Sequence, residues 1–219
     1  MNMSKTFKIL RYDPVTEAAP HFETFIHAPN PADSVLETLK DIRDSQDPSL
    51  ACRTQVDALK TDLIVIEPLP NLEIQKDLVV DLEPFWAAYR LVEPYLQPEG
   101  DVPPKGHLVE EEEFEPVFQY ITCILCAGCY AACPVASRDG RYVGPAALAK
   151  LYRFIKDPRD KRKWESLAKV DTPTGAWGCD TVFRCNDVCP KSVRPADGIE
   201  GVRRRLVAQR LKRIVGKNR

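Results

Sequence analysis

Seven of the eight cysteines in this chain lie in one window, from Cys123 to Cys189, and only Cys52 lies outside it. Thiolates bind soft metal ions and iron–sulfur clusters, and they also take part in redox reactions. The amino-terminal residues show no apolar core of a signal peptide, so we expect the thiols to be kept reduced. Clustered cysteines in such a chain predict a metal or redox site rather than a set of disulfides.

Two cysteine runs in this window have matching spacing. The first run, from Cys123 to Pro134, reads C-I-L-C-A-G-C-Y-A-A-C-P. Its C-x2-C-x2-C triplet can hold one side of a cuboidal cluster, and in proteins with two such runs the cysteine before proline ligates the other cluster. The second run, from Cys179 to Pro190, reads C-D-T-V-F-R-C-N-D-V-C-P, so Val182 stands where the middle cysteine should be.

This crossover of ligands divides the seven cysteines into two unequal sites. Four thiolates form the first site: Cys123, Cys126, Cys129 and Cys189. Three thiolates form the second site: Cys133, Cys179 and Cys185. The first set predicts a [4Fe–4S] cluster. At the second site Val182 leaves a fourth iron without a protein ligand, which predicts a [3Fe–4S] cluster.

Zinc sites with four thiolate ligands are the main structural alternative. Two such sites would need eight cysteines, and the window holds seven. The dense triplet followed by C-P is typical of iron–sulfur ligation. A zinc-stabilised interaction module without a redox role would be a protein of another class, and it would be colourless.

The composition is that of an ordinary globular protein, with 44% hydrophobic and 29% charged residues and a net charge of −1. No apolar run approaches the roughly 18 residues of a membrane-spanning helix. From Val202 to Arg219 the chain has eight basic residues and no acidic one, which fits a membrane-surface or partner contact or a solvated helix end. No motif supports binding of nucleic acid.

Hydrophobic patterning predicts the elements that must position the cysteines. The first half is mixed, with strands and one helix expected over the following segments: Thr6–Arg11, His21–Ile26, Asp33–Asp44 (the helix) and Asp62–Glu67. A connecting helix is expected after Asp81. Gln97–Glu115, rich in proline and glycine and ending in acidic residues, is interpreted as a linker or surface loop. The second half predicts helices over Ala146–Ile155 and Asp197–Val215.

The motifs together resemble the iron–sulfur subunit of succinate dehydrogenase and fumarate reductase. In the second half the resemblance rests on the two runs, on R-Y-V-G-P-A-A-L-A-K-L-Y-R-F (141–154) and on D-P-R-D (157–160). In the first half it rests on K-T-F-K-I-L-R-Y-D-P (5–14), D-P-S-L (47–50) and P-L-P-N-L-E-I-Q-K-D-L-V-V-D-L (68–82).

The resemblance implies an α+β protein: a truncated β-grasp ferredoxin-like domain (1–96), a linker (97–115) and an α-helical ferredoxin domain (116–219). Such a subunit passes electrons between a flavoprotein that carries FAD and a quinone site beside a membrane anchor. It would lie peripherally on the cytoplasmic face of a prokaryotic membrane, with no catalytic residue of its own. Pro134 would lie on the quinone side, although Val135 and Asp180 depart from the family's pattern there.

A second family with C-P-terminated runs is the iron–sulfur subunit of heterodisulfide-reductase or glycolate-oxidase type. Those proteins are expected to have two complete four-cysteine runs, so Val182 argues against them.

The [2Fe–2S] cluster implied by the resemblance has too few ligands in this chain. A plant-type site needs a C-x4-C-x2-C run and a distant fourth cysteine. Here Leu50 is followed directly by Ala51 and Cys52, so the loop with three of the four ligands is absent and Cys52 is left as a possible residual ligand. Two explanations are open: a true deletion, or a segment missing from the sequence as written.

Overall fold

The computed structural model describes residues 4–30, 32–52, 61–100, 103–162 and 164–216. The chain divides into two compact units, Met1–Leu82 and Glu83–Arg219. The sequence-based domain bounds assign residues 83–96 to the first domain, whereas helix α2 (Glu83–Leu91) belongs to the second unit. The physical reason is burial, because Phe85 of α2 is 2% exposed and its ring packs edge-on against Tyr130 of the second unit.

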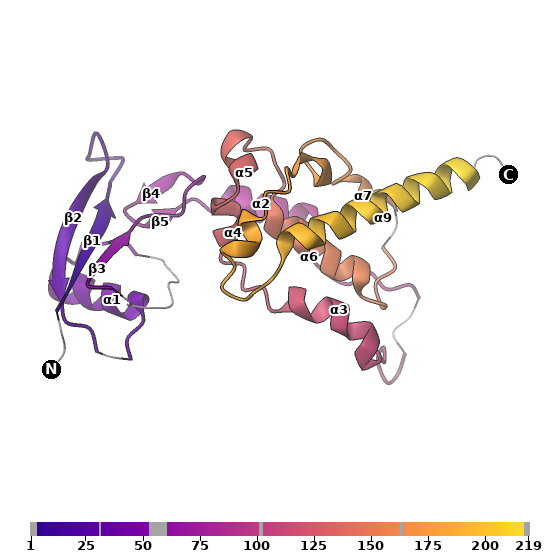
Figure 1. The fold of residues 1–219 in the computed structure, drawn as a ribbon, viewed down its shortest axis with the longest axis horizontal. Helices are drawn as coiled ribbons and strands as arrows, with labels where there is room; N and C mark the ends of the chain where they lie inside the picture. Colours follow the sequence, from indigo (N-terminus) through magenta and orange to yellow (C-terminus); the bar gives the residue numbers. More distant parts are fainter. Residues whose placement is uncertain (1–3, 31, 53–60, 101–102, 163, 217–219) are drawn as a thin grey trace. The chain divides into compact units, whose positions relative to one another are not determined.

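The first unit is built on a three-stranded sheet in the order β2-β1-β3 (Figure 1). Its strands are β1 (Lys5–Arg11), β2 (His21–His27) and β3 (Leu63–Ile66). β1 pairs antiparallel with β2 and parallel with β3, which is the arrangement expected at the centre of a β-grasp fold. A two-stranded ribbon, β4 (Ile74–Lys76) with β5 (Val79–Val80), follows.

One face of this sheet forms the core of the first unit. Phe7 and Ile9 alternate with exposed Lys8 and pack with Leu39 and Ile42 of helix α1 (Val35–Ser45). A capping box begins this helix, in which the Ser34 side chain accepts from the Glu37 amide while the Glu37 side chain accepts from the Ser34 amide. The predicted strands and helix of the first half are confirmed to within about two residues at each end.

A buried arginine joins β1 to the segment on either side of the Leu50–Ala51 bond. Arg11 Nε donates to Asp77 Oδ1 at 3.0 Å, and its other nitrogens donate to Ser49 Oγ and to Asp47. The second oxygen of Asp77 accepts from the Ala51 amide at 2.9 Å. The two sides of the junction are therefore held to the same charged pair.

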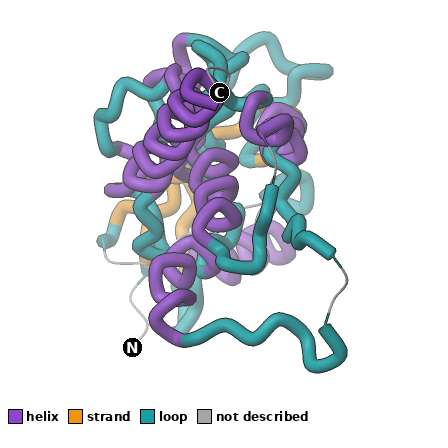
Figure 2. Tube along the Cα trace, turned by 90° about the vertical axis from the view of Figure 1, so that its right-hand side faces the viewer, coloured by secondary structure: helices purple, strands orange, loops and turns teal. Residues whose placement is uncertain are grey.

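The regular elements described in the second unit are helices, joined by long loops (Figure 2). Besides α2 they are α3 (Glu111–Ile121), α4 (Gly128–Ala131), α5 (Pro134–Arg138), α6 (Pro145–Lys156), α7 (Trp164–Ala168), the 3-10 turn η1 (Ala176–Gly178), α8 (Arg184–Asp187) and α9 (Pro195–Gly216). The helices expected over 146–155 and 197–215 are confirmed as α6 and α9. No helix of the described residues is long and apolar enough to cross a membrane.

Close contact between α6 and α9 brings the two cysteine runs together. Gly198 and Gly201 make this approach possible, because a Cβ on Gly198 would lie 3.2 Å from Ala149 Cα and one on Gly201 would lie 2.0 Å from the Tyr152 ring. α6 follows the first run and α9 follows the second run. Their packing therefore sets the distance between cysteines that are far apart in the sequence.

The interpretation of Gln97–Glu115 as linker or loop is wrong at its carboxyl end. α3 begins at Glu111, with Glu111, Glu112 and Glu113 in its first turn. Acidic side chains are favoured there by the partial positive charge of a helix amino terminus. The acidic run is solvent-exposed, as expected, but it starts a helix that leads into Cys123.

Candidate metal centre

The first of two hollows in the second unit is lined by four cysteines. These are Cys123, Cys126, Cys129 and Cys189. Cys123 and Cys126 lie between α3 and α4, Cys129 lies in α4, and Cys189 follows α8. Ala146 and Ala149 of α6 complete an apolar wall. The structure therefore brings together the four side chains that the crossover of ligands assigned to one site.

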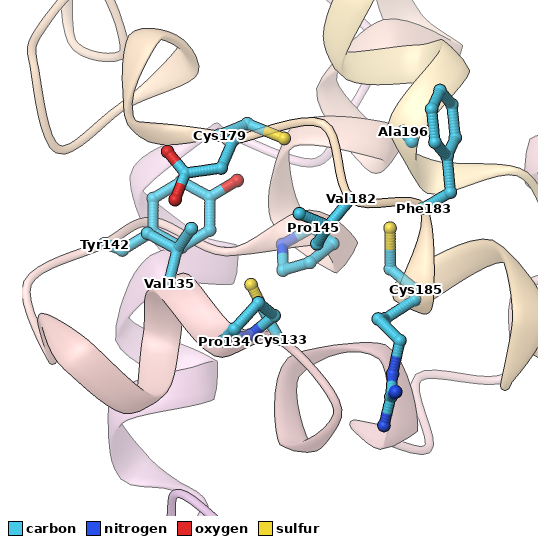
Figure 3. Close-up of a pocket in the computed structure, with 12 residues that line it drawn as sticks. Cys133, Pro134, Val135, Tyr142, Pro145, Cys179, Val182, Phe183, Cys185 and Ala196 are labelled. Atoms are coloured by element: carbon cyan, nitrogen blue, oxygen red, sulfur yellow. The ribbon is translucent and has the colours of Figure 1, made fainter.

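The second hollow is lined by the other three clustered cysteines (Figure 3). They are Cys133, Cys179 and Cys185. Val182 lines the same hollow, as do Pro134, Tyr142 and Phe183. The valine thus occupies, in space as well as in the sequence, the place of the missing fourth thiol.

The two runs share an unusual backbone conformation. Leu125 and Ala127, on either side of Cys126, have positive φ angles of 56° and 61°. Thr181 and Phe183, on either side of Val182, have φ angles of 56° and 61°. A non-glycine residue in this region costs about 1–2 kcal/mol. Val182 and Cys126 therefore occupy matching positions in two loops whose flanking residues have the same φ angles.

Burial raises the pKa of thiols in both hollows. The pKa of Cys129 is raised well above its usual range, first by desolvation and then by the neighbouring Cys123 and Cys126. Desolvation likewise raises the pKa of Cys185 to about 11, with Cys179 and Cys133 adding to the effect. Thiols of this kind are neutral at pH 7 unless cations compensate their charge, and iron ions do so when they displace the protons.

The four thiols of the first hollow line one shared space. Among the described residues, no group of three or more His, Cys, Asp or Glu side chains is arranged to hold a single metal ion. A tetrahedral zinc site needs its ligand sulfurs about 2.3 Å from a single point, whereas a cuboidal cluster has a metal at each of several corners.

Arg203 of α9 holds the loop that carries Cys179. Its guanidinium donates to the carbonyl oxygens of Ala176 at 2.8 Å and Cys179 at 2.6 Å, and to Thr181 Oγ1 at 3.3 Å. In addition, the Thr181 amide donates to Cys179 Sγ at 3.3 Å. In the sequence Arg203 is one of eight basic residues between Val202 and Arg219, and nothing local to it signals a partner so far along the chain.

Two further contacts fasten the second run. Asn186, between Cys185 and Cys189, accepts from the Ala196 amide at 3.0 Å through its side-chain oxygen and so ties the run to the start of α9. Arg138 of α5 donates to Asp180 at 2.8 Å, which joins the residues after Cys133 to those after Cys179. Sequence spacing alone did not identify either contact.

A partly buried lysine lies near the first hollow. Burial lowers the pKa of Lys150 on α6, and the negative charge of a Cys123 thiolate opposes that shift. A cation in this position reduces the net charge of a four-thiolate site. The sequence showed only a lysine in a helix, so its proximity to the site comes from the packing of α6 against the first run.

The remaining predicted site residues lie in two different places. Cys52 belongs to the first unit, where it packs against the core, and the sequence has no other cysteine before Cys123. It is therefore not part of either hollow. Pro134 is solvent-exposed at the rim of the second hollow.

Of the eight basic residues between Val202 and Arg219, Arg210 pairs with Asp171 at 2.6 Å, and Lys217 and Arg219 lie outside the described residues.

Two family models match the chain. A 4Fe-4S dicluster domain matches residues 119–193, the segment that contains both runs. A 2Fe-2S iron-sulfur cluster binding domain matches residues 46–87, which contain Cys52 alone among the cysteines.

Known relatives match most of the chain. The succinate dehydrogenase iron-sulfur subunit of Coxiella burnetii is 32% identical over 230 residues, covering 93% of this chain and 97% of that protein. The fumarate reductase iron-sulfur subunit of Escherichia coli O157:H7 is 31% identical over 219 residues, covering 88% of this chain and 89% of that protein.

A solved structure shares the fold. One chain of the Mycobacterium smegmatis Sdh1 complex in the apo form has a TM-score of 0.80 with this protein at 18% identity, covering 95% of this chain and 98% of that one. The cysteine runs, the paired hollows, the family models and the relatives agree, and the chain belongs to the family of iron–sulfur subunits of succinate dehydrogenase and fumarate reductase.

Proposed function

We propose that this chain is the electron-transfer subunit of a succinate:quinone oxidoreductase or quinol:fumarate reductase. It would pass electrons between a flavoprotein with FAD and a quinone beside a membrane anchor, lying peripherally on the cytoplasmic face of the membrane. The observation that carries the proposal is the division of the seven cysteines into one hollow with four thiols and one with three thiols and a valine.

The first hollow would hold a [4Fe–4S] cluster and the second a [3Fe–4S] cluster. When bound, such clusters supply one-electron redox chemistry at potentials that depend on cluster type, charge, hydrogen bonds and solvent exposure. The chain's own residues hold the cluster and exclude water: Cys129 and Cys185 are desolvated, and alanines of α6 form an apolar wall. No residue here acts on succinate, whose oxidation belongs to the flavoprotein.

The rim of the second hollow is the proposed surface for the quinone side. Val182 is 49% exposed and Phe183 is 47% exposed, and Pro134 is exposed beside them. The rim combines these apolar side chains with the exposed charges of Asp180 and Arg184. Its apolar part, next to the three-iron site, suits an apolar electron acceptor, and electrons need only a short path from the cluster to that surface. The first hollow, with its wall of α6, would receive electrons from the flavoprotein side.

The chain would lack the [2Fe–2S] cluster expected of its family. The alignment with the Coxiella protein runs over 230 positions but covers 93% of the 219 residues of this chain, so it includes gaps in this chain. Gaps of this kind are consistent with the loop missing between Leu50 and Ala51. Electron transfer from a flavin to the [4Fe–4S] cluster would then need another chain to bridge the distance.

Iron analysis of the anaerobically purified complex tests this proposal. We expect about seven irons per chain and, after oxidation, the EPR signal of a [3Fe–4S] centre near g = 2. About nine irons, with a rhombic [2Fe–2S] signal on reduction, would show that the missing ligands exist. Zinc in colourless protein, or succinate oxidation by the chain alone, would contradict the proposed function itself.

A further inference from the structure

Tyr142 places a buried hydroxyl in the second hollow. It lies between α5 and α6, is 2% exposed and lines the hollow beside the three cysteines. Figure 3 shows its ring next to Cys179, with the hydroxyl directed into the space that the cysteines surround. Among the described residues, no hydrogen bond of ordinary geometry reaches the hydroxyl oxygen, although the Cys179 thiol lies close enough to interact with it.

A buried hydroxyl without a partner is costly. Leaving such a donor unpaired costs about 1–3 kcal/mol, whereas a phenylalanine at the same position would avoid that cost. Burial and the negative charge of a Cys179 or Cys133 thiolate raise the pKa of Tyr142, so the group stays a neutral O–H donor. The hollow therefore contains a donor that faces sulfur atoms.

The first hollow has no such group. Its described lining consists of cysteines, alanines, prolines, other aliphatic residues and Lys191, with no hydroxyl side chain. The two sites thus differ in two respects: the ligand lost at Val182 and the donor added by Tyr142. Hydrogen bonds to the sulfurs of an iron–sulfur cluster are one of the factors that set its reduction potential.

We infer that the Tyr142 hydroxyl donates a hydrogen bond to a sulfur of the three-iron cluster, either a sulfide or the Cys179 thiolate, and raises the reduction potential of that cluster. The inference rests on the proposed function, because it requires a cluster in the second hollow. The bond withdraws electron density from sulfur and stabilises the reduced, more negative state. Tyr142 is a tuning residue and does not ligate iron.

Removing the hydroxyl provides the direct test. In Tyr142→Phe, redox titration of the g = 2 signal in the purified complex should show a lower potential for the three-iron cluster. We expect about a tenfold fall in the ratio of reduced to oxidised cluster at a fixed potential, equivalent to about 59 mV for a one-electron couple. The four-iron cluster in the same sample should keep its potential.

Tyr152→Phe is the matched control, because it removes a hydroxyl from a tyrosine of α6 that lines neither hollow. Its two clusters should titrate as in the parent protein. An unchanged three-iron potential in Tyr142→Phe, or an equal shift in Tyr152→Phe, would overturn the inference.

A second variant strengthens the donor instead of removing it. Site-specific replacement of Tyr142 by 3-fluorotyrosine keeps the hydroxyl and makes it a better donor, so the three-iron potential should rise. This variant decides the question if Tyr142→Phe fails to retain its cluster, and an unchanged or lower potential would then overturn the inference. Failure of the proposed function is recognised separately, because the parent protein would lack the g = 2 signal.

Discussion

The two cysteine runs have the same pattern of backbone φ angles but differ in the number of cysteines that they carry. Positive φ angles fall at matching positions in both, at Leu125 and Ala127 in the first run and at Thr181 and Phe183 in the second. One side chain differs between them where a ligand is required, Cys126 against Val182. The comparison teaches that two runs with matching backbone angles can each line a hollow while a single side chain changes the number of thiols in it, from four to three.

Substituting the cysteine of each run that is predicted to ligate the other run's cluster should have the largest effect on iron content. Cys189→Ala, in the second run, should abolish the four-iron cluster and leave about three irons per chain. Cys133→Ala, in the first run, should abolish the three-iron cluster and leave about four. Iron content with EPR measures both. If each substitution removed the cluster of its own run, the crossover would be wrong.

Restoring the missing ligand should make the two runs alike. Val182→Cys supplies a fourth thiolate on a backbone that already matches the first run. We expect the iron content to rise from about seven to about eight and the g = 2 signal of the oxidised protein to fall. Val182→Ala is the control and should keep the signal, since alanine offers no ligand. A persistent signal in the cysteine variant would show that more than this residue excludes the fourth iron.

Removing the arginine that holds the second run should weaken one site selectively. Arg203→Met deletes three donors to the segment around Cys179, at a cost of roughly 1–3 kcal/mol. The three-iron signal should decay faster during thermal or oxidative challenge, while the four-iron signal follows the parent. Arg204→Met is matched by position, since the exposed Arg204 donates to the Glu200 carbonyl oxygen of its own helix at 3.4 Å. Equal decay in the two variants would rule out a specific role for Arg203.

Relieving backbone strain in the two runs should have the smallest effect, a small gain in the stability of the holoprotein. Thr181 has a φ of 56°. Because threonine is branched at Cβ, it fits this region less well than Leu125 at the matching position, which is not branched at Cβ. Asparagine adopts this conformation more readily, and it keeps a side-chain oxygen that can accept from Arg203 as the Thr181 hydroxyl does at 3.3 Å. Thr181→Asn should therefore stabilise the holoprotein by up to about 1 kcal/mol. Leu125→Asn should stabilise it less. The melting temperature of cluster absorbance measures both, and a lower melting temperature for Thr181→Asn would contradict the account.

Much of the site follows from sequence spacing because the ligands of each run are local. Three of the four ligands of the first site lie within seven residues of one another, so their proximity needs no knowledge of the fold. Local signals also predicted the strands of the first half and the helices after Gly144 and Arg194, because hydrophobic periodicity and proline positions can be recognised without knowledge of the fold. The motifs likewise indicated the family. The absence of the family's loop after Leu50 was predicted from two motifs that directly adjoin in the sequence, and it stays a prediction.

The sequence by itself therefore predicted the division of the cysteines, with a valine in place of the eighth, and it indicated the family of the protein. Only the tertiary structure decided that α2 belongs to the second unit, that the acidic run begins α3, that Tyr142 lines the second hollow, and that Arg203 binds the segment around Cys179. The physical reason is that these features depend on which distant segments are buried against each other. The packing of α6 on α9, through Gly198 and Gly201, creates that proximity, and no local pattern encodes it.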